Sequence, residues 1–187
     1  DPRATPGHKI GDFVRIATFL READVSVPDV LAYDAVQGYA LLGDMGDMSF
    51  DKALLAQVQP EKAIYSLATD VLIGFRGIKK AAVTLPSYYK SHVHEGRRRV
   101  VDWYMPLVKK ERNGSDVVQS YLRVWDDIEA ALPPCPEGFL HIDYHLENLM
   151  WMPDANGLHK CGVLDFQGAM WGPQPYDLAN LLENVRV

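Results

Sequence analysis

Two short motifs near the end of the 187-residue chain constrain its fold more than any other feature. The first spans residues 141–148 and has the form H-x-D-x-x-x-x-N, with Asp143 five positions before Asn148. The second is an apolar run that ends in Asp165 and Phe166. A carboxylate at an acceptor hydroxyl, followed by two oxygen ligands for a divalent cation, is what phosphoryl transfer requires. The spacing therefore predicts a phosphoryl-transfer site on the loops at strand ends.

Each of these residues receives a separate chemical role. Mg²⁺ prefers hard oxygen ligands and keeps several waters, so one carboxylate, one amide oxygen and the substrate phosphates are enough to hold it. We therefore expect Asn148 and Asp165 to bind Mg²⁺, and Asp143 to orient and deprotonate the acceptor hydroxyl. Taken singly, each is an ordinary polar loop residue, but the combined spacing favours the site.

The segment between the two motifs predicts how the metal ligands meet. Asn156 and Gly157 form the strongest short hairpin signal, because both residue types tolerate positive φ. A two-residue turn there pairs residues whose numbers sum to 313, which places Asn148 opposite Asp165 with Cα atoms about 4.5–5.5 Å apart. A turn centred on Pro153 and Asp154 would shift the register and separate the pair.

Together these residues resemble the aminoglycoside phosphotransferase family, the small-molecule branch of the protein-kinase-like superfamily. The family motifs read H-G-D-x-x-x-x-N, [IL]-D-[FW] and D-[LI]-A, and residues 177–179 match the last. The resemblance implies that Asp143 is catalytic, that Asn148 and Asp165 bind the metal, and that His141 and Asp177 brace the catalytic loop. Two departures leave the acceptor open: Ile142 replaces a small or basic residue, and Glu147 stands where aminoglycoside-modifying relatives often carry glycine.

Residues 163–182 are most similar to a bacterial subgroup, the anomeric kinases of N-acetylmuramate and N-acetylglucosamine. This resemblance implies ATP and Mg²⁺ as cofactors and a small hydroxylated acceptor, with a sugar preferred. Aminoglycoside and amino-alcohol acceptors remain open within the enzyme class. The alternative from another class is a catalytically silent nucleotide-binding or scaffolding module.

The resemblance and the apolar periodicity together predict an α+β, protein-kinase-like fold. Residues 1–46 form a partial N-lobe and hinge, and residues 47–187 form a helical C-lobe. Apolar spacing predicts helices over 10–23, over 50–76 with a break at Pro60, over 100–108 despite Pro106, and from a cap at Ser115 or Asp116 to 132. Residues 25–34 and 38–42 read as two strands.

The hinge follows the second of these strands. By resemblance, Leu42, Gly43, Asp44 and Met45 meet the adenine edge. Only nine residues precede Ile10 and none forms a phosphate-covering loop or supplies a strand lysine, so we expect the fold to be incomplete at both ends.

Composition excludes several other function classes. A net charge of −6 and a pI near 5.5 argue against a nucleic-acid-binding face, and we read the arginines at 97–99 as a solvated helix face. The sequence has no apolar run of membrane-spanning length and no signal-peptide core at its start, which predicts a cytoplasmic protein without membrane contact. We expect free thiols at Cys135 and Cys161. Four aromatic residues are expected to be core rather than sugar platforms: Trp103, Tyr104, Tyr121 and Trp125.

Overall fold

The computed structural model describes residues 9–183; residues 1–8 and 184–187, the outer ends of the two predicted lobes, lie outside this part. The α-helices are α1 (Ile10–Glu22), α2 (Phe50–Leu55), α3 (Glu61–Phe75), α4 (His94–Arg99), α5 (Met105–Lys109), α6 (Ser115–Ala131) and α7 (Pro175–Leu182). The strands are β1 (Val30–Asp34), β2 (Tyr39–Leu42), β3 (Glu137–Leu140), β4 (Leu149–Trp151), β5 (Cys161–Val163) and β6 (Met170–Pro173). This mixture of helices and short antiparallel strand pairs agrees with the predicted α+β class.

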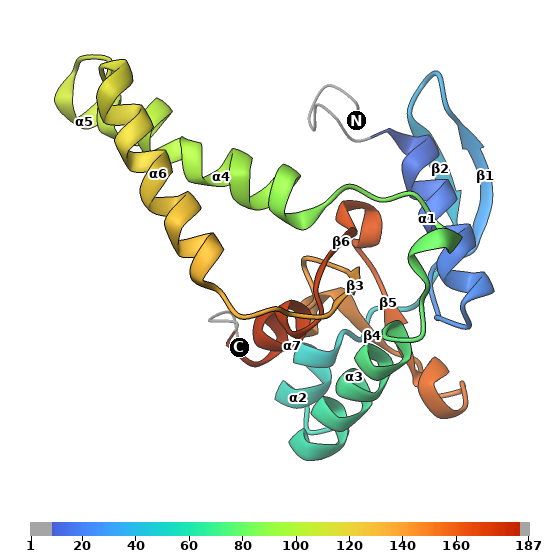
Figure 1. The fold of residues 1–187 in the computed structure, drawn as a ribbon. Coiled ribbons are helices and arrows are strands. Elements are labelled where there is room, and N and C mark those ends of the chain that lie inside the picture. The colour runs from blue at the N-terminus through green and yellow to red at the C-terminus, as the bar shows by residue number, and fades with distance from the viewer. Residues whose placement is uncertain (1–8, 184–187) are drawn as a thin grey trace.

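The first part of the chain forms one helix and one hairpin. Helix α1 agrees with its prediction, whereas the first strand begins at Val30 and not at Val25. Strands β1 and β2 pair in antiparallel fashion, and Gly38 adopts a φ of 75° in the turn between them. Asp34 stabilises this turn because its Oδ1 accepts hydrogen bonds from the backbone N–H groups of Val36 and Gln37. Figure 1 shows α1 beside this hairpin at one end of the molecule.

Helices α2 and α3 follow the predicted hinge segment (residues 42–45). Pro60 separates them, as predicted. Pro60 lies at the N-cap of α3, where its missing N–H costs no helical hydrogen bond. The inward face of α3 is fully packed and contributes Ile64, Ala68, Val71 and Phe75 to the core. Helix α3 therefore provides a buried face against which later strands and loops pack.

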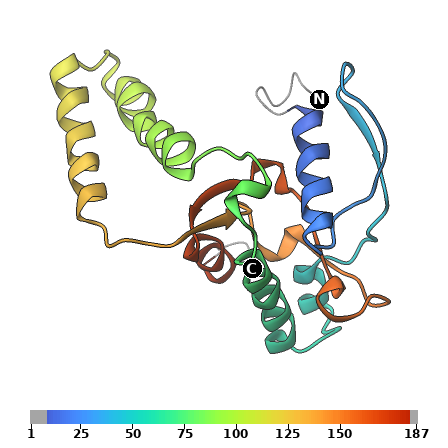
Figure 2. The same cartoon turned by 45° about the vertical axis from the view of Figure 1, so that its right-hand side comes forward.

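A helical hairpin, which we call the helical arm (residues 89–131), extends away from α1 and β1–β2 in both views (Figures 1 and 2). Its first half contains π-helical turns at Tyr89–Val93 and Val100–Tyr104, and the second lies just before Pro106. Proline has no N–H to donate, so it interrupts the regular ladder of helical hydrogen bonds at this point. The helix over 100–108 is thus present, but it is not a regular α-helix. Gly114, and not Ser115 or Asp116, is the N-cap of α6.

The structure corrects two predictions for the arm, in each case for part of the residues concerned. Trp103 and Tyr104 are 77% and 64% exposed, because they lie at the far end of the arm, away from the body of the molecule. The predicted solvated arginine face is found at Arg98 and Arg99, which are exposed, but not at Arg97. The Arg97 side chain is only 11% exposed, and its Nη1 contacts Asp126 at 2.7 Å and Glu129 at 3.4 Å on α6. Opposite charges on the two helices draw this arginine inward.

The predicted two-residue turn at Asn156 and Gly157 is also wrong. Leu149 pairs with Val163, so partner numbers sum to 312 and not 313. Asn156 has a φ of −116°, whereas the expected turn needs positive φ at both central residues. The chain instead turns at Pro153 and Asp154, with Ala155 N–H donating to Met152 O, and then forms the 3₁₀ turn Gly157–Lys160. Asn148 consequently faces Leu164, whose N–H donates to the Asn148 carbonyl at 2.9 Å.

The core gathers around the strand pairs β3–β6 and β4–β5. Leu146, Leu149, Val163 and Phe166 are fully buried, and they flank the two predicted site motifs. Cys161 is buried and Cys135 exposed, and both are free thiols. Within residues 9–183, no helix is long and apolar enough to cross a membrane. The boundary expected near Gly46 between two lobes stays a prediction.

Candidate active site

Asp143 lies in the irregular segment between β3 and the 3₁₀ turn Leu146–Asn148. Its side chain is 49% exposed, while its neighbours His141 and Tyr144 are fully buried. The loop therefore presents the Asp143 carboxylate to solvent from between two buried residues. We call residues 141–148 the catalytic loop, after the role predicted for Asp143.

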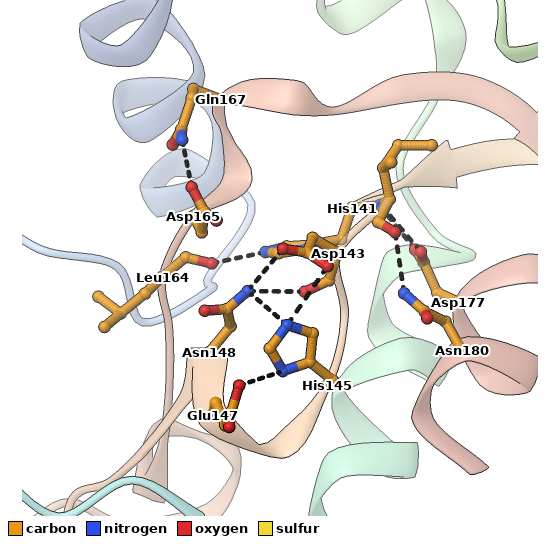
Figure 3. Close-up of polar contacts among 11 residues, drawn as sticks. His141, Asp143, His145, Glu147, Asn148, Leu164, Asp165, Gln167, Asp177 and Asn180 are labelled. Carbon is orange, nitrogen blue, oxygen red and sulfur yellow. Dashed lines mark hydrogen bonds and ion pairs between the residues drawn. The ribbon is translucent and has the colours of Figure 1, made fainter. Parts of the chain in front are cut away.

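His141 connects this loop to the segment that carries Asp165. Its ring Nε2 donates to the carbonyl oxygen of Leu164 at 2.7 Å, as Figure 3 shows. A carbonyl can only accept, so this bond places the proton of the neutral ring on Nε2. Burial lowers the pKa of His141 to about 4, although the Leu164 carbonyl and nearby carboxylates act in the opposite direction. The histidine is therefore neutral near pH 7.

Asp177 and Asn180 on α7 hold the start of the catalytic loop. Asp177 is 2% exposed, and its two carboxylate oxygens accept hydrogen bonds from the backbone N–H groups of His141 at 2.6 Å and Ile142 at 2.9 Å. Burial raises the pKa of Asp177 to about 6, and these two N–H donors oppose that shift. The Asn180 side-chain amide donates to the Ile142 carbonyl at 2.9 Å. Both polar groups of the Ile142 backbone are thus bound by one helix.

Two further residues fix the middle of the loop. The Tyr144 hydroxyl donates to the Ala68 carbonyl of α3 at 2.9 Å. His145 is 3% exposed, and its Nε2 lies 3.3 Å from Asp143 Oδ1 and 3.2 Å from Asn148 Nδ2. The imidazole therefore lies against both predicted functional side chains.

Asn148 lies at the end of the loop, with its side chain directed back toward Asp143. Its Nδ2 donates to the Asp143 carbonyl at 2.9 Å and lies 3.3 Å from Asp143 Oδ2. Donation to a carbonyl fixes which end of the amide is nitrogen, so the amide oxygen must point elsewhere. Asn148 can therefore offer an oxygen ligand while its nitrogen holds the loop.

Asp165 lies one residue beyond the position that faces Asn148 across the β4–β5 pair. It adopts a left-handed φ of 59°, is exposed, and accepts a hydrogen bond on Oδ1 from the Gln167 amide. In Figure 3 its carboxylate points toward Gln167. The predicted face-to-face pairing of Asn148 with Asp165 is absent, so their joint role as metal ligands rests on their chemistry and stays a prediction.

The oxygen donors of the site fit a hard cation. One carboxylate and one oriented amide oxygen are sufficient protein ligands for Mg²⁺, which keeps several waters. Within the described residues, no group of three or more histidine, cysteine or acidic side chains is arranged to hold a metal ion. Magnesium binding by Asn148 and Asp165 stays a prediction.

The predicted hinge residues follow β2. The Gly43 N–H donates to the Asp29 carbonyl at 2.7 Å, and Met45 packs close to Gly162 on β5. Gly43, Asp44 and Met45 line a cavity of about 340 Å³, whereas Leu42 does not. The segment then runs beside β4, where the Met48 carbonyl accepts from the Trp151 N–H at 2.7 Å. The hinge is thereby joined to the strand that follows the catalytic loop.

Sequence reasoning gave no role to four residues that the structure places at the site: Tyr144, His145, Gln167 and Asn180. The repeat of histidine at 141 and 145 around Asp143 was a visible signal, but it does not show which ring contacts the carboxylate. Gln167 and Asn180 each follow an identified aspartate, by two and three residues respectively. Their contacts depend on backbone geometry that spacing alone does not provide.

Comparison with known proteins identifies the family of the chain. The model of the phosphotransferase enzyme family, which includes the aminoglycoside phosphotransferases, matches residues 2–187. The chain belongs to this phosphotransferase family. The match extends over the helical arm as well as the two motifs.

The curated relatives of the chain carry the names of amino-sugar kinases. It is 28% identical over 186 residues to an N-acetylmuramate/N-acetylglucosamine kinase of Caulobacter vibrioides, and 32% identical over 177 residues to the protein of that name from Pseudomonas aeruginosa. These alignments cover 95% and 94% of the chain, but 51% and 49% of the relatives. The chain thus spans about half the length of the curated relatives it matches.

Solved structures support the fold assignment. A GDP complex of an aminoglycoside 2′-phosphotransferase-IIIa mutant matches with a TM-score of 0.61 and 17% identity, over 94% of this chain and 60% of that one. A choline/ethanolamine kinase family protein from Mesorhizobium loti matches with a TM-score of 0.56 and 18% identity, over 91% and 54%. The predicted protein-kinase-like fold is therefore confirmed.

Proposed function

We propose that this phosphotransferase, in its full-length form, transfers the γ-phosphoryl group of ATP to a hydroxyl of an amino sugar. The observation that carries this proposal is the half-exposed Asp143 carboxylate, which stands in a loop fixed by α3, α7 and the end of β5. A general base must be reachable by its substrate and yet held in place. Asp143 meets both conditions.

In this proposal Asp143 accepts the proton of the acceptor hydroxyl as it attacks the phosphoryl group. His145 Nε2 and Asn148 Nδ2 lie 3.3 Å from its two carboxylate oxygens and restrict the rotation of the carboxylate. Neutral His141 holds the backbone of Leu164, the residue directly before Asp165, in a fixed position. These residues set the geometry, and Asp143 takes the proton.

Mg²⁺ would be held by a carboxylate oxygen of Asp165 and the amide oxygen of Asn148. When bound, the ion neutralises the negative charge that develops on the transferred phosphate. The segment Leu42–Met45 would receive the adenine through backbone groups, as expected for the hinge. Support comes from Met45, which packs close to Gly162 on β5, and from the hydrogen bond between the nearby Met48 carbonyl and Trp151 on β4.

The amino-sugar acceptor is supported by the two curated relatives, which are named as kinases of N-acetylmuramate and N-acetylglucosamine. The solved neighbours include aminoglycoside and choline/ethanolamine kinases, so the fold by itself does not select the acceptor. The negative net charge would attract a cationic acceptor, and the proposal therefore needs a direct comparison of acceptors.

The test is an ADP-release assay on the full-length protein with four acceptors: N-acetylmuramate, N-acetylglucosamine, kanamycin and choline. We expect turnover with an N-acetylated sugar and little with the other two compounds. Phosphorylation of kanamycin without any of the N-acetylated sugars would contradict the acceptor. The absence of turnover with every acceptor, together with unimpaired nucleotide binding, would favour a silent nucleotide-binding module.

The matched variant is Asp143→Asn, which keeps the size of the side chain and removes its basicity. Turnover should fall by about 10²–10⁴-fold, because a positioned base contributes that much to the rate. Nucleotide affinity, measured by calorimetry, should be nearly unchanged. A variant that retains most of its turnover would remove Asp143 from the mechanism.

A further inference from the structure

Gln167 contacts the side chain of Asp165. Its side-chain amide donates a hydrogen bond to Asp165 Oδ1. Asp165 is the N-cap residue of the 3₁₀ turn Phe166–Gly168, but its side chain makes no capping bond to that turn. The carboxylate direction is therefore not fixed by the usual local contact, and the Gln167 amide supplies the contact instead.

The backbone that carries the Asp165 and Gln167 side chains is held by packing and by a hydrogen bond. Phe166 is fully buried and its ring stacks on that of Phe13 in α1, with the ring centroids 4.9 Å apart. The Ala169 N–H closes the turn on the Phe166 carbonyl at 3.0 Å, and Ala169 is 1% exposed. An exposed carboxylate thus projects from an anchored turn, with one oxygen bound.

Gln167 is also placed by its surroundings. It is half-buried and lines a cavity of about 230 Å³ together with Lys9, Asp12 and Arg15 of the α1 region. Its side chain therefore borders the same cavity as α1. Because the residue is half-buried, its side chain has less freedom to lose when the amide orients the carboxylate.

The chemistry of an amide suits this position. An amide N–H donor binds one carboxylate oxygen and leaves the negative charge of the group intact, so the second oxygen keeps its full attraction for a cation. A lysine in the same place would neutralise that charge, and a glutamate would repel the carboxylate. Hydrogen bonds from a second layer of residues commonly orient the carboxylates that bind metals.

We propose that Gln167 is a positioning residue that holds the Asp165 carboxylate in the orientation needed to bind the divalent cation. The inference rests on the proposed function, because that proposal makes Asp165 a ligand. Gln167 itself touches neither the cation nor the acceptor. Its contribution is to cation affinity rather than to the phosphoryl-transfer step.

The test compares Gln167→Met with the unaltered full-length protein, with Mn²⁺ as the probe in the presence of ADP. Methionine keeps the length and much of the volume of glutamine but cannot donate a hydrogen bond. Electron paramagnetic resonance of free Mn²⁺ gives the dissociation constant without any turnover. We expect Mn²⁺ binding to weaken by about 10- to 100-fold, the usual effect of losing such a residue.

Activity provides a second readout. The Mg²⁺ concentration for half-maximal turnover should rise, while kcat at saturating Mg²⁺ should fall much less. Gln167→Asn retains the amide on a shorter stem, so its affinity should lie between those of the other two proteins. If the methionine variant fails to fold by thermal unfolding, this asparagine variant still decides the question by its weaker Mn²⁺ binding.

Two controls separate the possible failures. Gln174→Met removes another partly buried amide, at the N-cap of α7, which approaches the Glu137 carbonyl at 3.5 Å, and it should leave Mn²⁺ binding unchanged. Asp165→Asn should abolish tight Mn²⁺ binding. If it does so while Gln167→Met binds Mn²⁺ as well as or better than the unaltered protein, the role of Gln167 is overturned and the proposed function stands. If Asp165→Asn has no effect, both are overturned.

Discussion

Ile142 has the most strained backbone position in the catalytic loop. Its φ of 80° lies in the left-handed region, which is a true outlier for a β-branched residue. Asp177 accepts from its N–H and Asn180 donates to its carbonyl, so side chains on α7 maintain a conformation that the residue itself disfavours. The family motif has glycine here, which adopts positive φ without strain.

Replacing Ile142 by glycine and, separately, by alanine isolates this strain. Both variants remove the isoleucine side chain beyond Cβ, and they differ mainly in their tolerance of positive φ. We expect Ile142→Gly to be more stable than Ile142→Ala by about 1 kcal/mol, measured by urea unfolding. Equal stability of the two variants would mean that the loop relaxes to negative φ.

His141 gives the protein a pH-dependent component of stability. Its folded-state pKa of about 4 lies below the ordinary value of 6.5, because burial disfavours the charged ring. The resulting stabilisation is fully present above pH 6.5 and is lost as the pH falls toward 4. The shift corresponds to a few kcal/mol, roughly 1.4 kcal/mol for each pH unit.

The measurement compares the unfolding free energy of the protein with that of His141→Asn between pH 7 and pH 4.5. The advantage of the histidine should shrink as the solution is acidified, on the order of 2–3 kcal/mol over this range. In proton NMR spectra the ring signals of His141 should not titrate above pH 5. A ring that titrates near pH 6.5 would show that His141 is reachable by solvent.

At the scale of elements, Arg97 joins the two long parts of the helical arm. It contacts Asp126 and Glu129 on α6, and Glu129 also lies 2.8 Å from His94 Nε2. Arg97 is only 11% exposed and Glu129 only 21%, so water screens this group less than an open surface pair. The contact between α4 and α6 therefore has an electrostatic component.

Arg97→Ala should destabilise the arm by about 1–2 kcal/mol, because it leaves a partly buried carboxylate without its main cation. The change is best followed by amide hydrogen exchange in α6, where protection should fall. Arg99→Ala is the matched control, since Arg99 is exposed and belongs to the same arginine run. A loss of protection as large in the control would show that the effect is one of helix propensity.

The elements differ in how far their sequence determines them. Helices α1 and α3 could be predicted because their apolar residues repeat at helical spacing, and Pro60 marks a boundary by its missing N–H. The β4–β5 register could not be predicted, because the Asn-Gly signal at 156–157 competes with Pro153 at the preceding turn. The choice between them depends on contacts of the loop with the rest of the fold. At the site, spacing identified Asp143, Asn148 and Asp165 as candidates.

At the scale of the whole molecule, the helical arm and the body differ in burial. Helix α6 is 17 residues long and has no buried residue, whereas the 15-residue α3 buries one complete face. Most helical stability in proteins comes from the packing of an apolar face. The two helices should therefore open with different free energies, although their lengths are similar.

Native-state hydrogen exchange of the chain tests this difference. Amides in the middle of α6 should exchange at least about tenfold faster than those in the middle of α3, because local opening of α6 exposes little apolar surface. Comparison of these two helices within one sample removes differences in pH and temperature. Equal protection would show that the arm unfolds only together with the body.

The contacts that hold the catalytic loop have a consequence for the order in which the protein is made. Asp177 and Asn180 reach back 35 to 38 residues to His141 and Ile142, and they lie close to the end of the described chain. A ribosome that has released only the residues before α7 has already released Asp143, but not the side chains that fix its loop. The strained turn at Ile142 cannot be held at that stage. The Asp143 carboxylate is therefore synthesised early but becomes positioned late, after α7 has left the ribosome and docked.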